Sequence, residues 1–472
     1  MRRFILAFSA AFALFACGGS EDSDLFADSG TAPDTSTGDA ALDGGGDTGG
    51  DSSLADVVVD TGPTCQGLEC QIVKCDGATT TLSGVVYDPA GLRPIPNVAV
   101  YVPNGATAAI ADGLTCSSCQ APLTGKPLSV VTTDAKGHFA LKDVPVGANI
   151  PLVMQLGKWR RSVTVPSVSA CVDNPIADKN LTRLPRNKTE GNLPLIALES
   201  NGFDQLECFL VNQIGISSAE LTAATGTGRV HVYKGTTPSQ GLPAGATDAY
   251  AFWANLATMK NYDLLFNACE GQLPARDTVG PAAYTNMKSY LEAGGRLIGE
   301  HYQYNWFGST VQCGGTCKGP VDFNGVATWG PTTPTNPPET VDVSHPRGQV
   351  FSDWLVAVGA STTAGQITLN DTRNDVGAVN APTTRWLYDA TTTFGLSFNT
   401  PLGSGNQCGR AVFTDYHAGG TYTTPNAAWP TSCNGQPTTD HKNSGLAMEY
   451  AFFDAFACVQ DDTKPTVVPP TQ

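Results

Sequence analysis

The spacing of hydrophobic residues changes once along this 472-residue chain, and the change divides it into two structural classes. Between about residues 79 and 170, short β-branched runs alternate with polar positions, and residues 132–141 predict a strand, a tight turn at Gly137 and a second strand. After residue 190, short apolar strands alternate with segments of helical spacing. The first pattern predicts a small all-β sandwich. The second predicts a parallel sheet with helices on both faces.

The sequence after residue 190 predicts the order of helices and strands in the second half. The helix expected at 281–293 starts at Pro281 and ends before Gly294 and Gly295, which are residues typical of these positions. Ligands bind at the carboxyl ends of the strands in a sheet of this kind, so polar residues directly after a strand are candidate site residues. Strands are expected at 193–198, 229–233, 262–268 and 296–301, and further helices at 203–214, 249–259 and 446–458.

The amino terminus predicts export and lipidation. Arg2 and Arg3 precede an apolar run at residues 4–15, which has the length of a signal-peptide core and is too short to span a bilayer as a helix. Ala16 and Cys17 resemble a bacterial lipobox, which implies cleavage after residue 16 and acylation of Cys17. An ordinary secretory signal followed by a chance cysteine is the alternative.

The residue after Cys17 is glycine rather than an acidic residue. We therefore expect an outer-membrane lipoprotein that faces the periplasm or the cell surface and reaches the membrane through its lipid anchor. Residues 17–63 are expected to form a disordered acidic tether, because residues 18–63 hold ten aspartates, one glutamate and no lysine or arginine. The rest of the chain is only mildly acidic and has no cluster of basic residues, so we expect no nucleic-acid partner.

Fourteen cysteines indicate an oxidising compartment and structural disulfides. If Cys17 is acylated, an odd number remains, so at least one cysteine stays unpaired. Cys116 and Cys119 form one close pair, and Cys313 and Cys317 form another. The alternative to disulfides near the start of the folded region is a zinc site, whose ligands would be Cys65, Cys70, Cys116 and Cys119.

Residues 84–88, 133–139 and 144–147 resemble the carboxypeptidase regulatory-like, transthyretin-type domain, and the turn Thr-Asp-x-x-Gly-x-Phe is the most specific of these likenesses. The resemblance implies a non-catalytic extracellular β-sandwich. Related sandwiches bind carbohydrate, and the alternative is a spacer. The candidate contact patch is Trp159 with Arg160 and Arg161, since an aromatic face stacks on a sugar while guanidinium groups bond its hydroxyls.

The second half resembles the class I glutamine-amidotransferase-like fold, in its ThuA-like branch, at residues 262–266, 290–301, 344–346 and 409–417. The resemblance implies a flavodoxin-like, three-layer α/β domain. It also places His345 near the site, although the residue itself precedes Pro346 and is expected to shape a loop.

The whole chain after Cys65 resembles myxobacterial lipoproteins of unassigned function that join these two domains. The expected organisation is a signal peptide at 1–16, the lipidated cysteine and tether at 17–63, a Cys-rich β-sandwich at 64–185, an α/β domain at 186–460 and a disordered tail at 461–472.

The chain departs from the amidotransferases at the nucleophile. Their cysteine stands on a sharp strand-to-helix turn, and the corresponding turn here, residues 299–303, has His301 in that place. Cys269 follows an earlier strand without such a turn, so we expect it to be buried or disulfide-bonded. A catalytic Cys269 paired with His417 is the alternative.

A polar cluster is expected at the carboxyl edge of the sheet. Two histidines with carboxylates could transfer protons or hold a divalent metal; apart from such a metal, we expect no cofactor. Hydrogen-bonded residues of a catalytically inactive fold are the alternative. The candidate catalytic residues are His301, His417, Glu300, Asp415 and Glu270, and the aromatic residues Tyr302 and Trp306 are expected to wall the site or stack on a sugar.

Together these features predict a non-catalytic cell-envelope lipoprotein that binds polysaccharide or acts as a scaffold for envelope proteins. The alternative is a hydrolase or metal-dependent enzyme that acts on a sugar or an amide at a pocket formed by His301 and His417.

Overall fold

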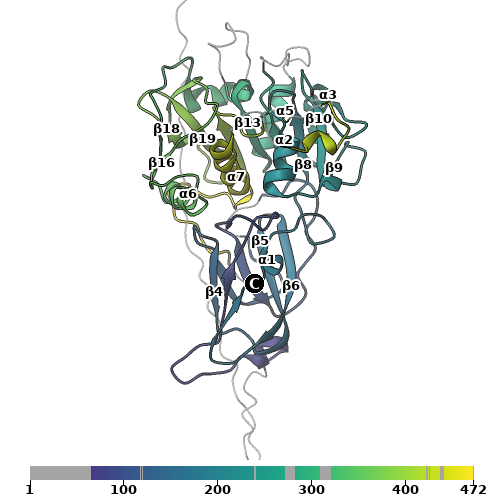
Figure 1. Cartoon of the computed structure of the whole chain (residues 1–472), viewed down its shortest axis with the longest axis vertical. Coiled ribbons are helices and arrows are strands. Elements are labelled where there is room, and N and C mark those ends of the chain that lie inside the picture. The colour runs from purple at the N-terminus through teal and green to yellow at the C-terminus, as the bar shows by residue number, and fades with distance from the viewer. Residues whose placement is uncertain are drawn as a thin grey trace, which may run out of the picture. The chain divides into compact units, whose positions relative to one another are not determined.

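The structure is a computed structural model that describes residues 65–116, 119, 121–238, 241–271, 282–308, 320–420, 422, 424, 426–435 and 441–470. Residues 63–472 form one compact unit. It is mostly β-sheet, in several sheets, with some helices (Figure 1). Cys17 and the predicted signal, tether and Cys313–Cys317 pair lie outside the described residues. Among the residues that are described, no helix has the length and apolar character needed to cross a membrane.

Two sheets form the amino-terminal part, as the β-branched runs predict. Gly137 makes the predicted turn with φ 71°, and a Cβ there would lie 2.7 Å from the carbonyl oxygen of Val86, so only glycine fits. The first sheet has the order β4 (His138–Lys142), β1 (Thr81–Val85), β7 (Asp173–Ile176); the second has the order β3 (Pro127–Thr132), β2 (Ala99–Pro103), β5 (Gly147–Leu156), β6 (Trp159–Val168). The short helices η1 (Gly67–Gln71) and α1 (Lys179–Thr182) flank them.

A larger mixed sheet forms the second part. Its strands from β11 to β20 are parallel, and those from β20 to β16 are antiparallel. The order is β11 (Thr247–Asp248), β10 (Val230–Lys234), β8 (Ile196–Ser200), β12 (Leu264–Asn267), β13 (Arg296–Glu300), β20 (Gly409–Thr414), β19 (Thr393–Thr400), β18 (Thr384–Tyr388), β15 (Glu339–Val341), β16 (Gln366–Ile367); β9 (Leu221–Thr222) pairs with β10, and β14 (Ala327–Trp329) pairs with β17 (Val376–Val379).

Alternate residues of each central strand face helices on opposite sides of this sheet. In β13, Leu297 packs in one hydrophobic cluster with Met287 of α5, whereas Ile298 packs in another with Phe452 of α7 (Figure 1). The helices are α2 (Leu206–Phe209), α3 (Ala249–Trp253), α4 (Leu256–Met259), α5 (Ala282–Glu292), α6 (Pro346–Ala357) and α7 (Lys442–Phe456); the shorter turns are the π-helical η2 (Leu210–Ile214) and the 3-10 helices η3 (Ser218–Glu220), η5 (His301–Trp306), η6 (Val321–Val326) and η7 (Thr431–Cys433).

Two expected helices differ from the prediction. The segment 249–259 is split into α3 and α4, because the side chain of Asn255 accepts a hydrogen bond from the Thr258 amide and starts a new helix. The segment 203–214 begins as helix only at Leu206 and continues as η2. Apolar periodicity does not show either interruption.

Five disulfides join described cysteines: Cys65–Cys70, Cys75–Cys171, Cys116–Cys408, Cys119–Cys458 and Cys208–Cys433. The prediction of structural disulfides is confirmed. The zinc-site alternative is wrong, because all four of its proposed ligands are oxidised. Cys116 and Cys119 do not pair with each other; each bonds instead to a cysteine of the second part of the chain.

The predicted sugar-contact patch is wrong. Trp159 is completely buried, and its ring meets those of Phe452, Phe453 and Phe456 of α7 edge-on, at centroid distances of 6.0–6.3 Å. Arg160 is buried beside it. The half-buried Arg161 donates to the carbonyl oxygens of Asn180 and Arg183, at 2.6 and 3.0 Å. Trp159 therefore joins the two parts of the chain, and its ring offers no face to a ligand.

The expected disordered tail is also wrong for its first residues. Asp462 is buried and bonds Arg410 at 3.0 Å and Arg347 at 2.5 Å, and Asp454 of α7 pairs with both of the same arginines. Burial raises the pKa of Asp462, but the charges of the two arginines outweigh it and hold that pKa well below its usual range. Two carboxylates and two guanidinium groups therefore form one buried network, which joins the segment around residue 462 to the sheet.

We expect Asp462→Ala to lower the free energy of unfolding by about 3–5 kcal/mol, because it leaves two buried guanidinium groups short of a counter-charge. Urea unfolding followed by tryptophan fluorescence measures the loss. The matched control is Asp461→Ala at the exposed neighbouring position, where little change is expected.

The same loss should depend on pH. The folded-state pKa of Asp462 is lower than its unfolded-state pKa of about 3.9, so its charge stabilises the folded state fully above that pH. This stabilisation is lost as the pH falls toward the lower, folded-state pKa, where the carboxylate takes up a proton. The difference between wild type and Asp462→Ala should therefore be full at neutral pH and shrink in acid. An equal loss for both variants at neutral pH would contradict a buried charge network.

Candidate metal centre

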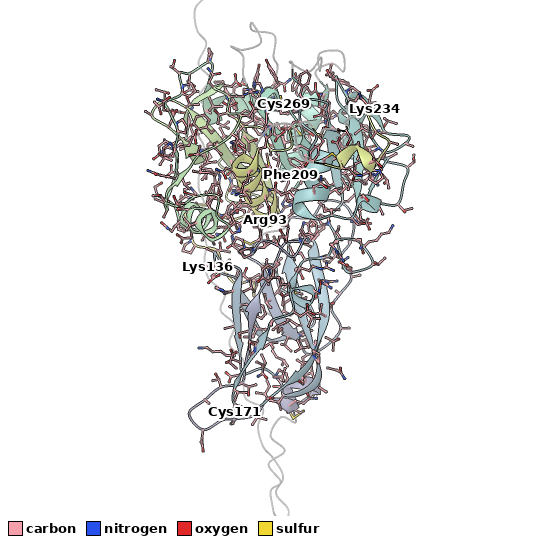
Figure 2. All side chains as sticks on the ribbon, in the orientation of Figure 1. Arg93, Lys136, Cys171, Phe209, Lys234 and Cys269 are labelled. Atoms are coloured by element: carbon pink, nitrogen blue, oxygen red, sulfur yellow. A yellow bond between two sulfur atoms is a disulfide. The ribbon has the colours of Figure 1, made fainter. Side chains whose placement is uncertain are left out.

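Three metal-ligating side chains meet at the carboxyl edge of the sheet. Cys269 follows β12 by two residues, His301 follows β13 directly, and His417 follows β20 by three. These strands are parallel neighbours in the sheet, so their carboxyl ends lie side by side. Figure 2 shows Cys269 at this edge of the second part. The sequence predicts the edge and both histidines, and pairs Cys269 with His417 only as the alternative to a buried or disulfide-bonded cysteine.

The three donor atoms face one another. The Sγ of Cys269 lies 3.2 Å from His301 Nδ1, and His417 Nε2 lies 3.2 Å from the same nitrogen. All three atoms lie within 4.8 Å of one another, and all three residues are buried. Cys269 is a free thiol, and burial raises its pKa. A cluster of this composition could hold a metal ion.

His301 owes its position to a strained turn. Its φ is 40°, in the left-handed region that non-glycine residues rarely adopt, at the junction between β13 and η5. This is the turn at which the sequence predicts a histidine in place of a nucleophilic cysteine. The half-buried ring of Tyr302 lies next to the imidazole, with a centroid distance of 4.0 Å. Strain at such a turn is typical of a functional site.

A carboxylate holds the outer nitrogen of each histidine. His417 Nδ1 lies 2.6 Å from Asp371 Oδ2, and His301 Nε2 lies 3.3 Å from Asp375 Oδ2. Arg373 braces the first pair, because its guanidinium donates to Asp371 Oδ1 at 2.5 Å. The hydrogen bond from His417 holds the pKa of Asp371 well below its usual range. The Arg373 guanidinium also lies 3.2 Å from His417 Nδ1. The two carboxylates favour the ring proton on the outer nitrogen of each histidine.

This arrangement leaves too few protons inside the cluster. With the outer nitrogens protonated, His301 Nδ1 and His417 Nε2 both present lone pairs, only 3.2 Å apart. The thiol of Cys269 supplies one proton for the two nitrogens. Burial lowers the pKa of His301, so a second proton on its ring is disfavoured. A cation bound between the three donors would satisfy all of them at once.

Two predicted catalytic carboxylates have other roles. Glu300 accepts from the backbone amides of Cys269 at 3.4 Å and Ala418 at 3.2 Å, and Asp415 accepts from the amide of Asp375 at 2.7 Å. Both are completely buried, and burial together with a neighbouring carboxylate raises the pKa of each. They bond to the backbone of the loops that hold the donors rather than to a histidine ring, which corrects their predicted role as catalytic partners of the histidines.

The remaining predicted residues lie around the centre without joining it. Glu270 accepts from Thr236 and from the hydroxyl of Tyr250, and not from a histidine. Trp306 is completely buried and donates to Gln303 at 2.9 Å, so it cannot stack on a sugar. Tyr302 alone of the two aromatic candidates stays partly exposed.

His345 is structural, as its own sequence context predicts. Its Nδ1 accepts a hydrogen bond from the Gly348 amide at 3.1 Å, which makes it the amino-terminal cap of α6. The family resemblance suggests a place near the site, but its ring Nε2 contacts the carbonyl oxygen of Arg385, at 3.1 Å.

Sequence reasoning missed Asp371, Arg373 and Asp375. They belong to the loop between β16 and β17, which reaches the site because Thr372 bridges to Tyr416 next to His417. The available signal was the unbroken polar run at residues 370–375, directly after an apolar segment. Cys269 was visible in the sequence, but the adjacency of β12 and β13 that brings it to His301 was not.

Comparison with known proteins finds no matching family model and no matching curated protein. A cytoplasmic protein from Salmonella typhimurium aligns at 11% identity and a TM-score of 0.26, over 51% of this chain and 95% of its own. An exo-beta-1,4-mannosidase from Opitutaceae bacterium strain TAV5 aligns at 11% identity and 0.25, over 57% and 37%. A mutant cohesin–X-dockerin complex from Acetivibrio cellulolyticus aligns at 15% identity and 0.15, over 25% and 67%. These likenesses are too weak to bear on function.

We expect Asp371→Asn to move the ring proton of His417. An amide in place of the carboxylate can donate to Nδ1, which drives the proton to Nε2 and removes the inward lone pair. The ring nitrogen shifts of His417 in ¹⁵N NMR of chelator-treated protein measure the tautomer. The control is Asp353→Asn on α6, whose carboxylate accepts from Gln349 at 2.9 Å. Unchanged His417 shifts in Asp371→Asn would contradict the assigned tautomer.

Proposed function

We propose that this chain is a metal-dependent hydrolase of the cell envelope, with Cys269, His301 and His417 as the metal ligands. One observation supports it above the others: three inward donor atoms lie within 4.8 Å, while Asp371 and Asp375 hold the outer nitrogens of the two histidines. Carboxylates in this position fix the tautomer and orientation of metal-bound histidines in general.

The donor set suits zinc. Bond lengths of about 2.3 Å to sulfur and 2.0–2.1 Å to nitrogen in a tetrahedron place such donors about 3.3–3.6 Å apart. Two of the three separations here are 3.2 Å, and all three lie within 4.8 Å, so the donor atoms are close enough for one zinc ion after side-chain adjustment. Three protein ligands leave a fourth position for water, which is the pattern of catalytic rather than structural zinc.

A zinc ion held by Cys269, His301 and His417 would lower the pKa of a bound water and so supply a nucleophile near neutral pH. In the reaction that we propose, a water molecule gives up one proton and its oxygen bonds to the carbonyl carbon of an amide or ester. The bond from that carbon to the leaving nitrogen or oxygen then breaks, and the leaving atom takes the second proton of the water. The products are a carboxylate and an amine or alcohol. The expected role of the two candidate carboxylates changes accordingly: Glu300 and Asp415 support the ligands rather than touch the substrate.

The finer assignment of fold and location is part of the same proposal. Two small sheets sharing one core support a transthyretin-type sandwich, and the parallel run from β10 to β20 with helices on both faces supports a flavodoxin-like, ThuA-like domain. Membership of the myxobacterial lipoproteins, acylation of Cys17 and an outer-membrane location rest on sequence. Ten described cysteines in disulfides favour an oxidising compartment.

A metal-free acyl hydrolase is the second candidate. Cys269, His301 and Asp375 form a chain of nucleophile, base and orienting carboxylate, with steps of 3.2 and 3.3 Å. It leaves the second histidine and its own carboxylate without a role. The non-catalytic polysaccharide binder or scaffold remains a third proposal, but it no longer has the Trp159 surface on which it was based.

Metal content and hydrolysis together test the proposal. We expect residues 17–472 to bind about one zinc ion per chain, and Cys269→Ser and His417→Ala to weaken zinc binding more than about 100-fold. The probe for turnover is p-nitrophenyl acetate, and chelation should abolish its hydrolysis until zinc is restored. His138→Ala is the control, since that imidazole is exposed on β4.

The outcomes separate the candidates. Turnover that survives complete zinc removal but is lost in Cys269→Ser would replace the metal mechanism by the thiol mechanism. Zinc binding equal in wild type and in both ligand variants would contradict the site itself.

A further inference from the structure

Two buried carboxyl groups share one guanidinium group where the two parts of the chain meet. Asp88 follows β1 by three residues and Glu449 lies on α7, and both side chains are completely buried. Arg93 lies between them: its Nη2 is 3.1 Å from Asp88 Oδ2, and its Nε donates to Glu449 Oε2 at 2.6 Å. Gln213 of η2 donates to the same oxygen of Glu449, at 3.1 Å. Figure 2 shows Arg93 at this junction.

The shared guanidinium balances only one of the two carboxyl groups. The groups that act on Glu449 are Arg93, Asp88 and Gln213. The other charged or titratable side chains described on α7 and on the elements packed against it are exposed or face other groups. Arg347 and Arg410 bond Asp454 and Asp462, Arg296 and Arg161 donate to backbone carbonyl oxygens, Glu300 accepts from backbone amides, Tyr450 donates to the carbonyl oxygen of Arg347, Asp353 accepts from Gln349, Arg160 lies beside Tyr101, and Lys442 is exposed.

This count of charges favours one bound proton. If Asp88 and Glu449 were both ionised, the cluster would carry one buried negative charge without a counter-charge. Such a charge is costly to bury, and a carboxyl group in this position takes up a proton instead. One proton on the pair leaves the cluster with no net charge.

Two oxygen atoms of the cluster indicate where that proton lies. Apart from its ion pair with Arg93, Asp88 Oδ2 has no hydrogen-bond partner, and neither does Glu449 Oε1. Burial raises the pKa of Asp88, against the charge of Arg93 and a hydrogen bond from the Glu449 carboxyl. Burial also raises the pKa of Glu449, to about 8. In neutral solution Glu449 therefore holds the proton and donates it toward Asp88.

The cluster borders solvent, so this proton can exchange. The side chain of Arg93 is 18% exposed. Together with Gln213 it lines a groove of about 840 Å³ between η2, the start of α7 and the turn after β1.

We propose that Asp88, Arg93 and Glu449 form a pH-dependent latch between the amino-terminal part and α7. The shared proton keeps the latch closed in neutral solution. In mildly alkaline solution the proton leaves, two carboxylates meet at a single guanidinium group, and the turn after β1 moves away from α7. The disulfides Cys116–Cys408 and Cys119–Cys458 keep the two parts attached, so the opening is local. The latch does not depend on the proposed hydrolase.

Replacing Glu449 by glutamine tests the latch, because Glu449→Gln keeps the shape and hydrogen bonds of the protonated carboxyl at every pH. The folded-state pKa of Glu449 lies above its unfolded-state value of about 4.3. Its proton therefore stabilises the folded state fully below that value, and this stabilisation is lost as the pH rises toward about 8. We expect the unfolding equilibrium constant of wild type, divided by that of Glu449→Gln, to rise about tenfold per pH unit between about pH 6 and 8 and to level off above.

Urea unfolding of residues 17–472 measures this ratio, with disulfides intact and chelator present so that metal binding adds no pH dependence. Asp88→Asn should remove the same pH dependence, because Arg93 then balances the one remaining carboxylate. The matched control is Glu292→Gln on α5, whose partly exposed carboxylate pairs with Lys288 at 3.2 Å. It should keep the pH dependence of wild type.

Amide hydrogen exchange, corrected for the effect of pH on the intrinsic amide rate, locates the opening. Peptides covering residues 86–96 and 446–456 should lose protection in wild type between about pH 7 and 9 and keep it in Glu449→Gln. The latch is overturned if the unfolding ratios of wild type to Glu449→Gln and to Asp88→Asn are independent of pH. It is also overturned if wild type loses protection evenly across both parts of the chain rather than at the junction.

Discussion

The parallel register of β12, β13 and β20 is the constraint on which the site depends. Because these strands are neighbours and run in one direction, the residues that follow them must lie together at one edge of the sheet. A thiol and two imidazoles occupy those positions here. Apolar side chains of β13 alternate between α5 and α7, so the strand ends that position the donors are fixed by packing on both faces.

Buried side chains and disulfides join the amino-terminal sheets to the second part of the chain. Trp159 reaches from β6 into the phenyl rings of α7, and α7 itself packs on the face of β13 and β20 opposite α5. Asp462 ties the end of the chain to Arg410 within β20. Disulfides from Cys116 and Cys119 cross the same junction. The amino-terminal sheets are therefore joined to α7 and to β20, the strand that precedes His417.

Sequence patterns predicted the structural elements that depend on neighbouring residues in the chain. The turn at Gly137, the strands that end before His301 and His417, and the helix that starts at Ala282 all follow from spacing and from glycine or proline signals. Contacts between segments far apart in the chain could not be predicted in this way. They include the burial of Trp159, the salt bridges of Asp462, and the contacts of Asp371 and Asp375 with the two histidines. An exposed aromatic and a buried one look alike in a sequence, and so do free and disulfide-bonded cysteines.

X-ray absorption at the zinc edge of the zinc-loaded chain tests most directly whether Cys269, His301 and His417 bind the metal. We expect one sulfur at about 2.3 Å and two imidazole nitrogens at about 2.0–2.1 Å from the zinc, with one further light atom from water. In Cys269→Ser the sulfur shell should vanish while zinc that remains bound keeps its imidazole scattering. A spectrum of wild type with no sulfur neighbour, or with oxygen neighbours alone, would contradict a metal centre built from Cys269, His301 and His417.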